Sequence, residues 1–303
     1  MVILPPLLAI KGSIMEVLVI DYQAPDAPTR FVESMRGTGF GVLTNHTINH
    51  TLIDQVYRDW QVFFNLPEAE KRQFLFNRNY ELVQDGFFPL EVAEVAKGNT
   101  IRDIKEFFHY YPSISKLPVC ISAATRELRE ELLDMAKVLL GWLEQALPVN
   151  LKHKLSMPLR KMVDEQYQTL LRILHYPPLP DSVEEGAIRA APHEDINLIT
   201  LLVAASAPGL QVLDAKGKWH DVPCEKNNIV VNVGDMLQEA TGEYYKATTH
   251  QVVNPIGEAA KTSRFSIPLF LHARDEVVLS ERYTARTYRD ERLRELGLLE
   301  EKA

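Results

Sequence analysis

The sequence predicts an α+β protein with a mainly-β core, flanked by helices on its N-terminal side and by one helix at the C-terminus. Apolar residues recur at helical spacing before residue 165. After that point, short β-branched runs alternate with turn signals, and a helical pattern returns only near the end of the chain. No helix separates the β-branched runs, so a sandwich or barrel is expected rather than a parallel βαβ sheet. We therefore divide the chain into a helical or mixed region (15–160), a β core (165–275) and a C-terminal helix (276–303).

Composition excludes several classes of protein. The 303 residues carry 33 Lys and Arg against 41 Asp and Glu, a net charge of −8, which argues against a nucleic-acid or membrane-surface protein. No apolar run reaches the roughly 18 residues of a membrane span. Cys120 and Cys224 are too few for a disulfide framework, so a cytoplasmic location is expected. The short apolar stretch 3–10 contains two prolines and no preceding basic residues, so it is not expected to be a signal peptide, and Met15 is an alternative start. The oligomeric state stays open.

Two helices stand out in the N-terminal region. Apolar side chains at 3-4 spacing run from Leu52 to Phe64, and Pro67 ends this pattern and suits the first turn of another helix. A longer helix is predicted over 122–147, and its apolar stripe indicates packing against a core. The stripe consists of Leu128, Leu132, Met135, Leu139 and Trp142.

The second half contains a series of candidate strands. They are predicted over 169–175, 196–204, 210–213, 218–222, 229–233, 246–253 and 263–271. The tetrapeptide from Asp214 to Gly217 predicts a hairpin, and Gly234-Asp235 marks another turn. A last helix is predicted over 283–299, where Leu293, Leu296 and Leu299 are apolar among many charges.

A histidine and a carboxylate two positions apart stand directly ahead of the strand predicted from residue 196. If the extended conformation begins one turn early, His193 and Asp195 point to the same face, while Glu194 points away. An imidazole and a carboxylate on one face can chelate a divalent ion. The H-x-D pattern is common by chance, so a third ligand is needed.

His250 can supply that third ligand from another predicted strand, since a barrel brings distant strands together. Two histidines and one carboxylate form the facial triad of non-haem Fe(II) oxygenases. Zinc hydrolases also use mixed histidine and carboxylate ligands, so the residue types alone leave the metal open.

Arg264 and Ser266 share one face of the last predicted strand. A guanidinium fork beside a hydroxyl is suited to bind a carboxylate through two contacts. A buried arginine needs an anionic partner, which is either a protein acid or a ligand. Because three candidate metal ligands are also present, we favour a bound carboxylate, and not a protein acid, as the partner of Arg264.

With these residues, and over nearly its whole length, the chain resembles the isopenicillin N synthase-like family of 2-oxoglutarate- and Fe(II)-dependent oxygenases. In the N-terminal region the similar segments are 19–21, 39–46, 63–67 with Glu70-Lys71, and 103–108. In the second half, the similar segments follow in the family's order and spacing. They are Tyr176-Pro177-Pro178, His193-Glu194-Asp195, Thr200-Leu201-Leu202, 209–212, 231–235, His250 and Arg264-x-Ser266.

This resemblance implies a double-stranded β-helix, or jelly roll, as the oxygenase core, with Fe(II) at its open end. His193, Asp195 and His250 would be the iron ligands. Arg264, Ser266 and Tyr176 would bind the distal carboxylate of 2-oxoglutarate. The implied reaction consumes O2, converts 2-oxoglutarate to succinate and CO2, and oxidises a small organic molecule, most simply by hydroxylation. Ascorbate is expected to stimulate it.

The sequence departs from the family pattern in two places. Many relatives have Asn-Tyr-Tyr-Pro where this chain has Leu174-His175-Tyr176-Pro177, a change that could alter how the cosubstrate or oxygen sits at the iron. Relatives commonly have arginine after the distal histidine, whereas this chain has Gln251. This change is expected to affect the groups that surround and orient the metal ligands.

Two alternatives to the 2-oxoglutarate-dependent oxygenase stay open. The first is a non-haem iron oxidase of the isopenicillin N synthase type, which uses the Arg-x-Ser pair for a substrate carboxylate and needs no 2-oxoglutarate. The second is a metal-dependent binding protein on the same barrel. We rank it last, because open metal positions beside a carboxylate site serve catalysis better than binding alone.

Overall fold

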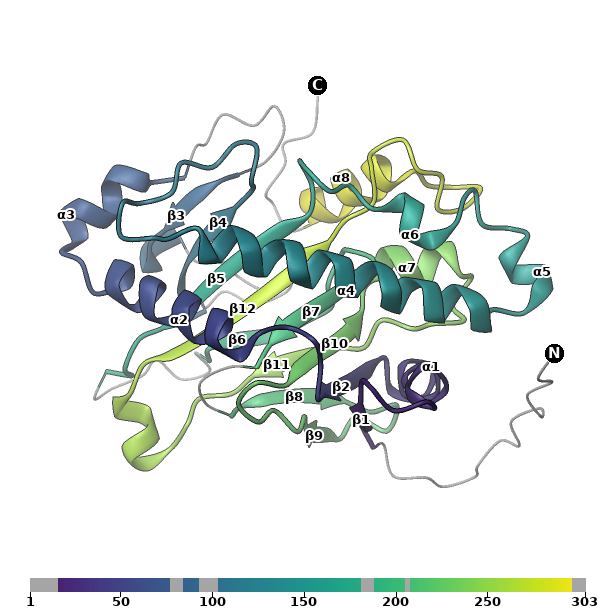
Figure 1. Ribbon diagram of the computed structural model, residues 1–303, viewed down its shortest axis with the longest axis horizontal. Helices are drawn as coiled ribbons and strands as arrows, with labels where there is room; N and C mark the ends of the chain where they lie inside the picture. The colour runs from purple at the N-terminus through teal and green to yellow at the C-terminus, as the bar shows by residue number, and fades with distance from the viewer. Residues whose placement is uncertain (1–15, 77–83, 93–102, 181–187, 205–207, 296–303) are drawn as a thin grey trace.

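The computed structural model describes residues 16–76, 84–92, 103–180, 188–204 and 208–295. Within these ranges the strands form two sheets (Figure 1). The larger sheet has the strand order β1 (Val19–Asp21), β2 (Phe40–Thr44), β10 (Ile229–Val233), β7 (Ile199–Val203), β12 (Arg264–Leu271), β5 (Leu170–Tyr176), β4 (Glu106–Tyr110) and β3 (Gly86–Phe88). The smaller sheet has the order β6 (Ala190–His193), β11 (His250–Val252), β8 (Leu210–Leu213) and β9 (Trp219–Asp221). Apart from the parallel pair β1–β2, these neighbours are antiparallel.

From β5 onward the chain passes back and forth between the two sheets. β5, β7, β10 and β12 lie in the larger sheet, and β6, β8, β9 and β11 lie in the smaller one. This path is that of a double-stranded β-helix, or jelly roll. Apolar side chains from both sheets fill the space between them. The larger sheet gives Phe40, Val42 and Val230, and the smaller gives Ala190, Leu210, Val212 and Val252.

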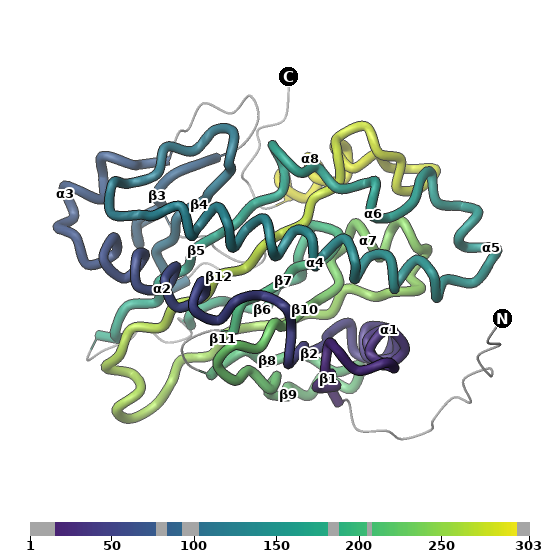
Figure 2. The backbone as a smooth tube through the Cα atoms, in the orientation of Figure 1, coloured from purple at the N-terminus to yellow at the C-terminus, as the bar shows by residue number. Residues whose placement is uncertain are grey.

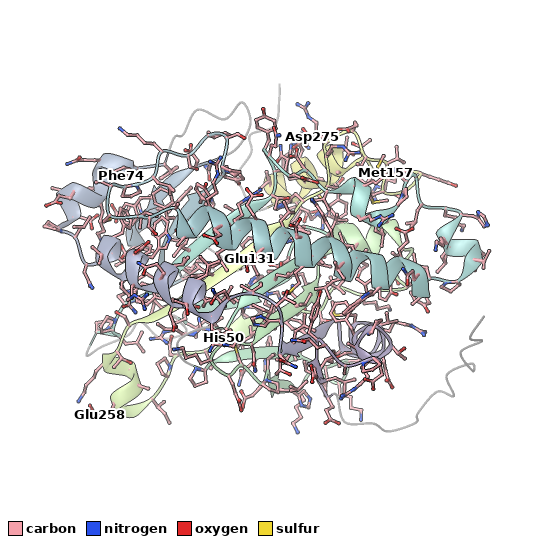
Figure 3. The ribbon with its side chains drawn as sticks, viewed as in Figure 1. His50, Phe74, Glu131, Met157, Glu258 and Asp275 are labelled. Atoms are coloured by element: carbon pink, nitrogen blue, oxygen red, sulfur yellow. The ribbon has the colours of Figure 1, made fainter. Side chains whose placement is uncertain are left out.

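Helices cover the other face of the larger sheet. The helices of the described ranges are α1 (Ala27–Thr38), α2 (His50–Phe64), α3 (Glu68–Lys71), α4 (Ala124–Ala146), α5 (Val149–Lys152), α6 (Leu159–Met162), α7 (Asp235–Ala240) and α8 (Ala285–Glu295), with short 3-10 helices η1 (Arg72–Phe74), η2 (Leu90–Val92) and η3 (Gly257–Lys261), and of these α1 and α4 contact the sheet most extensively. α4 crosses the sheet and packs on β12 and β7, with Glu131 marking the helix in Figure 3. Leu128, Leu132 and Leu139 of the expected stripe are buried in the main core. The helix predicted over 122–147 is therefore confirmed.

The predicted helix over residues 52–64 is confirmed as α2. It begins after Asn49, whose side chain accepts a hydrogen bond from the backbone N–H of Thr51 (2.9 Å). It ends at Phe64, shortly before Pro67. The predicted hairpin at Asp214 to Gly217 joins β8 to β9, and Gly217 adopts the positive φ of 78° that this turn requires. The last helix, α8, is described as far as Glu295, so Leu296 and Leu299 lie outside the described residues, as do residues 1–14.

The strand assignment is incomplete in two ways. The sequence did not predict β6, because Ala190, Ala191 and Pro192 carry neither β-branched nor aromatic side chains. It also placed few strands in the N-terminal region, where β3 and β4 join β1 and β2 in the larger sheet. Figure 2 shows strand β1 beside strand β9, and Val17 and Val222, which flank these strands, belong to one apolar cluster. The division at residues 160 and 275 stays a prediction.

None of the helices within the described ranges is both long enough and apolar enough to cross a membrane.

A close approach of two backbone segments occurs at Gly234, between β10 and α7. Its φ of −105° is ordinary, so space and not conformation requires glycine here. A Cβ atom at this position would lie 2.2 Å from the carbonyl oxygen of Asn197 and 2.3 Å from its side-chain oxygen. Two backbone hydrogen bonds hold the contact, from Gly234 to Leu198 (3.0 Å) and from Asp235 to Asp195 (2.7 Å). Gly234 thus fixes the loop that contains Asp195.

We expect Gly234→Ala to lower the free energy of unfolding by about 1–3 kcal/mol, because the added methyl group must displace the backbone of Asn197. Denaturant unfolding of the purified protein measures this change. Gly141→Ala is the matched control. Gly141 lies within α4 with no atom near its missing side chain, so this change should stabilise the protein by about 0.5–1 kcal/mol. Equal stability of the two variants would contradict the steric argument.

Candidate functional site

Two strands of the smaller sheet and the loop after one of them bring the three candidate metal ligands together. His193 ends β6 and His250 begins β11, and the two residues are direct partners in the antiparallel pair β6–β11. Asp195 follows two residues after β6. The nearest carboxylate oxygen, Oδ1 of Asp195, lies 3.9 Å from Nε2 of each histidine. One donor atom from each residue lies within 4.8 Å of the others.

The expected convergence of these residues is therefore found, but the local argument for it was wrong. His193 and Asp195 were placed on one face of a continuous strand running into residue 196. Instead His193 belongs to β6, and Asp195 lies in the loop before β7 starts at Ile199. The cross-strand pairing of His193 with His250 positions the two imidazoles, and the loop brings the carboxylate to them.

Both imidazole rings are oriented by backbone carbonyl groups. Nδ1 of His193 donates to the carbonyl oxygen of Ala191 (2.7 Å), and Nδ1 of His250 donates to that of Thr248 (3.1 Å). Because a carbonyl oxygen only accepts, each Nδ1 carries the proton and each Nε2 is left with its lone pair. Both Nε2 atoms face Asp195. This is the second-sphere arrangement that fixes metal-binding histidines.

The carboxylate of Asp195 is held in the same way, through one of its two oxygens. Oδ2 accepts hydrogen bonds from the Thr200 hydroxyl and from the side-chain amide of Asn232 (2.8 Å). Oδ1 is the oxygen turned toward the histidines. Residues 200 and 232 lie in segments that resemble the oxygenase family, but sequence reasoning gave neither side chain a role. A polar residue within an otherwise apolar buried strand, such as Asn232 in β10, was the available signal.

The protonation states of the site suit a metal ion. Burial alone would raise the pKa of Asp195, but its attraction to the protonated forms of His250 and His193 and its two hydrogen bonds outweigh burial, so the pKa is lowered. Burial, followed by the neighbouring His193, lowers the pKa of His250 to about 4. At neutral pH the site therefore holds an ionised carboxylate and a neutral His250, the forms that bind metals.

The donor set fits a divalent transition metal with open positions. It offers two imidazole nitrogens and one carboxylate oxygen, the set found in non-haem Fe(II) oxygenases. Asp195 and His250 are buried, whereas the side chain of His193 is 40% exposed. One side of the cluster is therefore accessible to small molecules, as a catalytic metal site requires.

A second group of candidate residues lies between the sheets, on the larger one. Arg264 begins β12 and pairs directly with Tyr176, the last residue of β5, and Ser266 follows two positions later on the same strand face. All three are buried. The guanidinium carbon of Arg264 lies 5.0 Å from the centre of the Tyr176 ring. A guanidinium group, a hydroxyl and a phenol thus lie buried at the paired ends of β5 and β12.

The two departures from the family pattern affect this site differently. His175 lies on the opposite face of β5 from Tyr176, where Nδ1 bonds Glu106 (2.7 Å) and Nε2 bonds Ser263 (2.9 Å). It is therefore not part of the pocket. Leu174 shares the face of Tyr176 and packs with Phe88 and Phe107, so this wall is apolar.

The second departure lies on the smaller sheet. The Gln251 side chain donates to that of Gln211 on β8 (2.9 Å). It links two strands and is not one of the three candidate ligands.

Comparison with protein families covers most of the chain. Residues 167–273 match the 2OG-Fe(II) oxygenase superfamily. Residues 19–130 match the N-terminal region described as non-haem dioxygenase in morphine synthesis. The two matches fall on the parts of the sequence where the resemblance was noted.

Individual relatives agree with these matches. The 2-oxoglutarate-Fe(II) type oxidoreductase hxnY of Emericella nidulans is 32% identical over 260 residues, covering 78% of this chain and 71% of that protein. Clavatol oxidase claD of Penicillium crustosum is 27% identical over 274 residues, covering 79% and 78%.

Solved structures confirm the jelly-roll fold. A crystal structure from Shewanella oneidensis, assigned as an oxygenase, is 50% identical and covers 94% of this chain and 100% of its own, with a TM-score of 0.83. A full-length Neurospora crassa protein in complex with alpha-KG shares the fold at 20% identity, with a TM-score of 0.76 and coverage of 92% and 96%. The names of the relatives favour the 2-oxoglutarate-dependent reaction over the two alternatives. The chain belongs to the 2OG-Fe(II) oxygenase superfamily and is an enzyme that uses Fe(II), 2-oxoglutarate and O2.

Proposed function

We propose that His193, Asp195 and His250 bind the ferrous ion of this enzyme. The observation that supports this assignment most strongly is the orientation of the three side chains. Each histidine donates its Nδ1 proton to a carbonyl group and turns Nε2 to Asp195 Oδ1, while Asp195 Oδ2 is already used by Thr200 and Asn232. Two nitrogens and one oxygen are thus prepared for a shared ion before it arrives.

We further propose that Arg264, Ser266 and Tyr176 bind the distal carboxylate of 2-oxoglutarate. The chemistry that the bound iron and cosubstrate supply is the oxidative decarboxylation of 2-oxoglutarate to succinate and CO2, coupled to oxidation of a substrate C–H bond. The protein's part is to bind and orient the cosubstrate and to exclude water. Arg264 suits this part because a guanidinium group in a buried site forms strong, directional bonds to a carboxylate.

The substrate that we propose is a small organic molecule, which the enzyme hydroxylates. Two observations support a compact and largely apolar substrate. The His193 side of the metal site is open, and Leu174, Phe88 and Phe107 line the face of the larger sheet beside Tyr176. The acidic composition disfavours a nucleic-acid substrate, and the low cysteine content supports a cytoplasmic location.

The reaction is tested by loading the protein anaerobically with Fe(II), ascorbate and 2-oxoglutarate and then admitting O2. Slow uncoupled turnover should release succinate even without the substrate, and the same assay then serves to screen candidate small molecules. A matched reaction without 2-oxoglutarate controls for background. Complete absence of succinate would count against the proposed function.

Asp195→Ala should abolish both iron binding and turnover, because the variant loses the only negatively charged ligand proposed for the ion. Metal analysis after anaerobic loading measures the number of iron ions bound per chain and so tests this prediction. The control is Asp214→Ala, which removes a carboxylate that bonds His220 (2.8 Å) in the β8–β9 hairpin and is not one of the proposed ligands. The control should keep one iron per chain. Full iron content in Asp195→Ala would refute the ligand assignment.

Arg264→Ala should weaken 2-oxoglutarate binding about 10- to 100-fold, since a charge-assisted contact contributes about 1.5–3 kcal/mol. Ser266→Ala removes only a neutral hydrogen bond of about 0.5–1.5 kcal/mol, so the loss should be about 2- to 10-fold. Titration of the anaerobic Fe(II) protein, followed by its visible absorption band, gives both constants. The exposed Arg282→Ala serves as the control. An unchanged constant in Arg264→Ala would place the carboxylate site elsewhere.

A further inference from the structure

A second buried arginine stands beside the pocket proposed for 2-oxoglutarate. Arg189 immediately precedes β6, four residues before His193, and is 1% exposed. The guanidinium carbon lies 5.7 Å from the centre of the Tyr176 ring, the same ring that Arg264 contacts at 5.0 Å. Nη2 donates to the backbone carbonyl of Thr262, two residues before Arg264 (3.3 Å). Arg189 therefore reaches from the edge of the smaller sheet to the start of β12.

No carboxylate in the described part of the chain pairs with Arg189, and its Nε lies buried without a hydrogen-bond partner. Burial, followed by the positive charge of Arg264, lowers the pKa of Arg189 to about 10, so the group still carries its charge at neutral pH. A buried cation that faces another cation is destabilising unless an anion lies nearby.

Two other buried cations show how this fold satisfies a charge that serves structure. Lys105 pairs with Asp103 at 2.8 Å, which balances its charge within the protein. Arg129 of α4 donates through Nη2 to two carbonyl groups, those of Glu165 (2.6 Å) and Thr169 (3.2 Å), although its Nε, like that of Arg189, has no hydrogen-bond partner. Within the described residues, Arg189 has no acid partner and one hydrogen bond, of 3.3 Å, where Arg129 has two. The described residues therefore leave the charge and the hydrogen-bond donors of Arg189 incompletely satisfied.

We propose that Arg189 is a second cationic group of the 2-oxoglutarate pocket, which acts with Arg264 on the distal carboxylate and makes the pocket selective for dicarboxylic over monocarboxylic 2-oxo acids. This inference rests on the proposed function of Arg264, Ser266 and Tyr176. It adds that the positive charge of Arg189, beside Tyr176, contributes to binding of the ligand. Two guanidinium groups in a buried site attract one carboxylate more strongly than either does in water.

The experiment compares two ligands that differ in the distal carboxylate alone. The full-length Fe(II) protein is titrated anaerobically with 2-oxoglutarate and with 2-oxobutyrate, up to millimolar acid, by calorimetry and by the visible absorption band. The variants are Arg189→Met, which keeps the length of the side chain without its charge, and Arg189→Lys, which keeps the charge. Arg129→Met is the matched control for loss of a buried arginine. Thermal unfolding of each protein without any 2-oxo acid gives a measure independent of binding.

For Arg189→Met we expect a 10- to 100-fold rise in the Kd of 2-oxoglutarate, because a charge-assisted contact to the distal carboxylate is lost. The Kd of 2-oxobutyrate, which has no distal carboxylate, should not change. Arg189→Lys should restore most of the affinity. Without ligand, Arg189→Met should unfold at the same temperature as the wild type or above it, since an unpaired buried charge is removed. Arg129→Met should unfold at a lower temperature and keep the wild-type preference between the two acids.

Three results would overturn the role of Arg189: an unchanged Kd for 2-oxoglutarate in Arg189→Met, an equal loss of affinity for both acids, or a lowered unfolding temperature together with unchanged selectivity. Each would mean that Arg189 supports the fold and not the ligand. A wild-type protein that binds iron but not 2-oxoglutarate would instead overturn the proposed function itself. The two failures are therefore distinguishable.

Discussion

The pairing of β6 with β11 is the constraint on which the candidate metal site depends. It sets His193 opposite His250, and the carbonyl groups of Ala191 and Thr248 then fix both rings. The third donor comes from a loop and needs separate support. Thr200 and Asn232 give this support through hydrogen bonds to one oxygen of Asp195, and Gly234 allows the loop to approach the β10–α7 junction. Donors on a rigid sheet with an independently anchored loop form a site that needs little rearrangement.

The sequence predicted the site better than it predicted the strands that carry it. Residue type and spacing singled out His193, Asp195, His250 and Arg264 as candidates, because potential metal ligands and a guanidinium group beside a hydroxyl are chemically distinctive. The strand β6 was missed because its alanines and proline have weak β propensity, and long-range pairing with β11 determines its conformation. Such pairing leaves no local periodic signal. Helices α2 and α4 were predicted correctly for the opposite reason, since their apolar stripes are local patterns.

The residues that support the site were also beyond sequence reasoning. Thr200 and Asn232 are polar residues within apolar segments and Arg189 is a buried cation, and only the folded chain shows which groups these side chains contact. His175 illustrates the converse. Its place next to Tyr176 in the sequence suggested an effect on the cosubstrate, but neighbouring residues of a strand point to opposite faces. His175 therefore bonds Glu106 and Ser263 behind the pocket wall.

The position of β6 in its sheet has a consequence for how the protein tolerates metal depletion. Among the described strands, β6 is the outermost one of the smaller sheet and pairs with β11 alone. An ion shared by His193 and His250 would act as a cross-link between this edge and the interior strand beside it. By mass action, such an ion adds stability in proportion to the logarithm of its free concentration. Without iron, the edge strand β6 would thus lose this cross-link and open more often, and exposed edge strands are where aggregation begins.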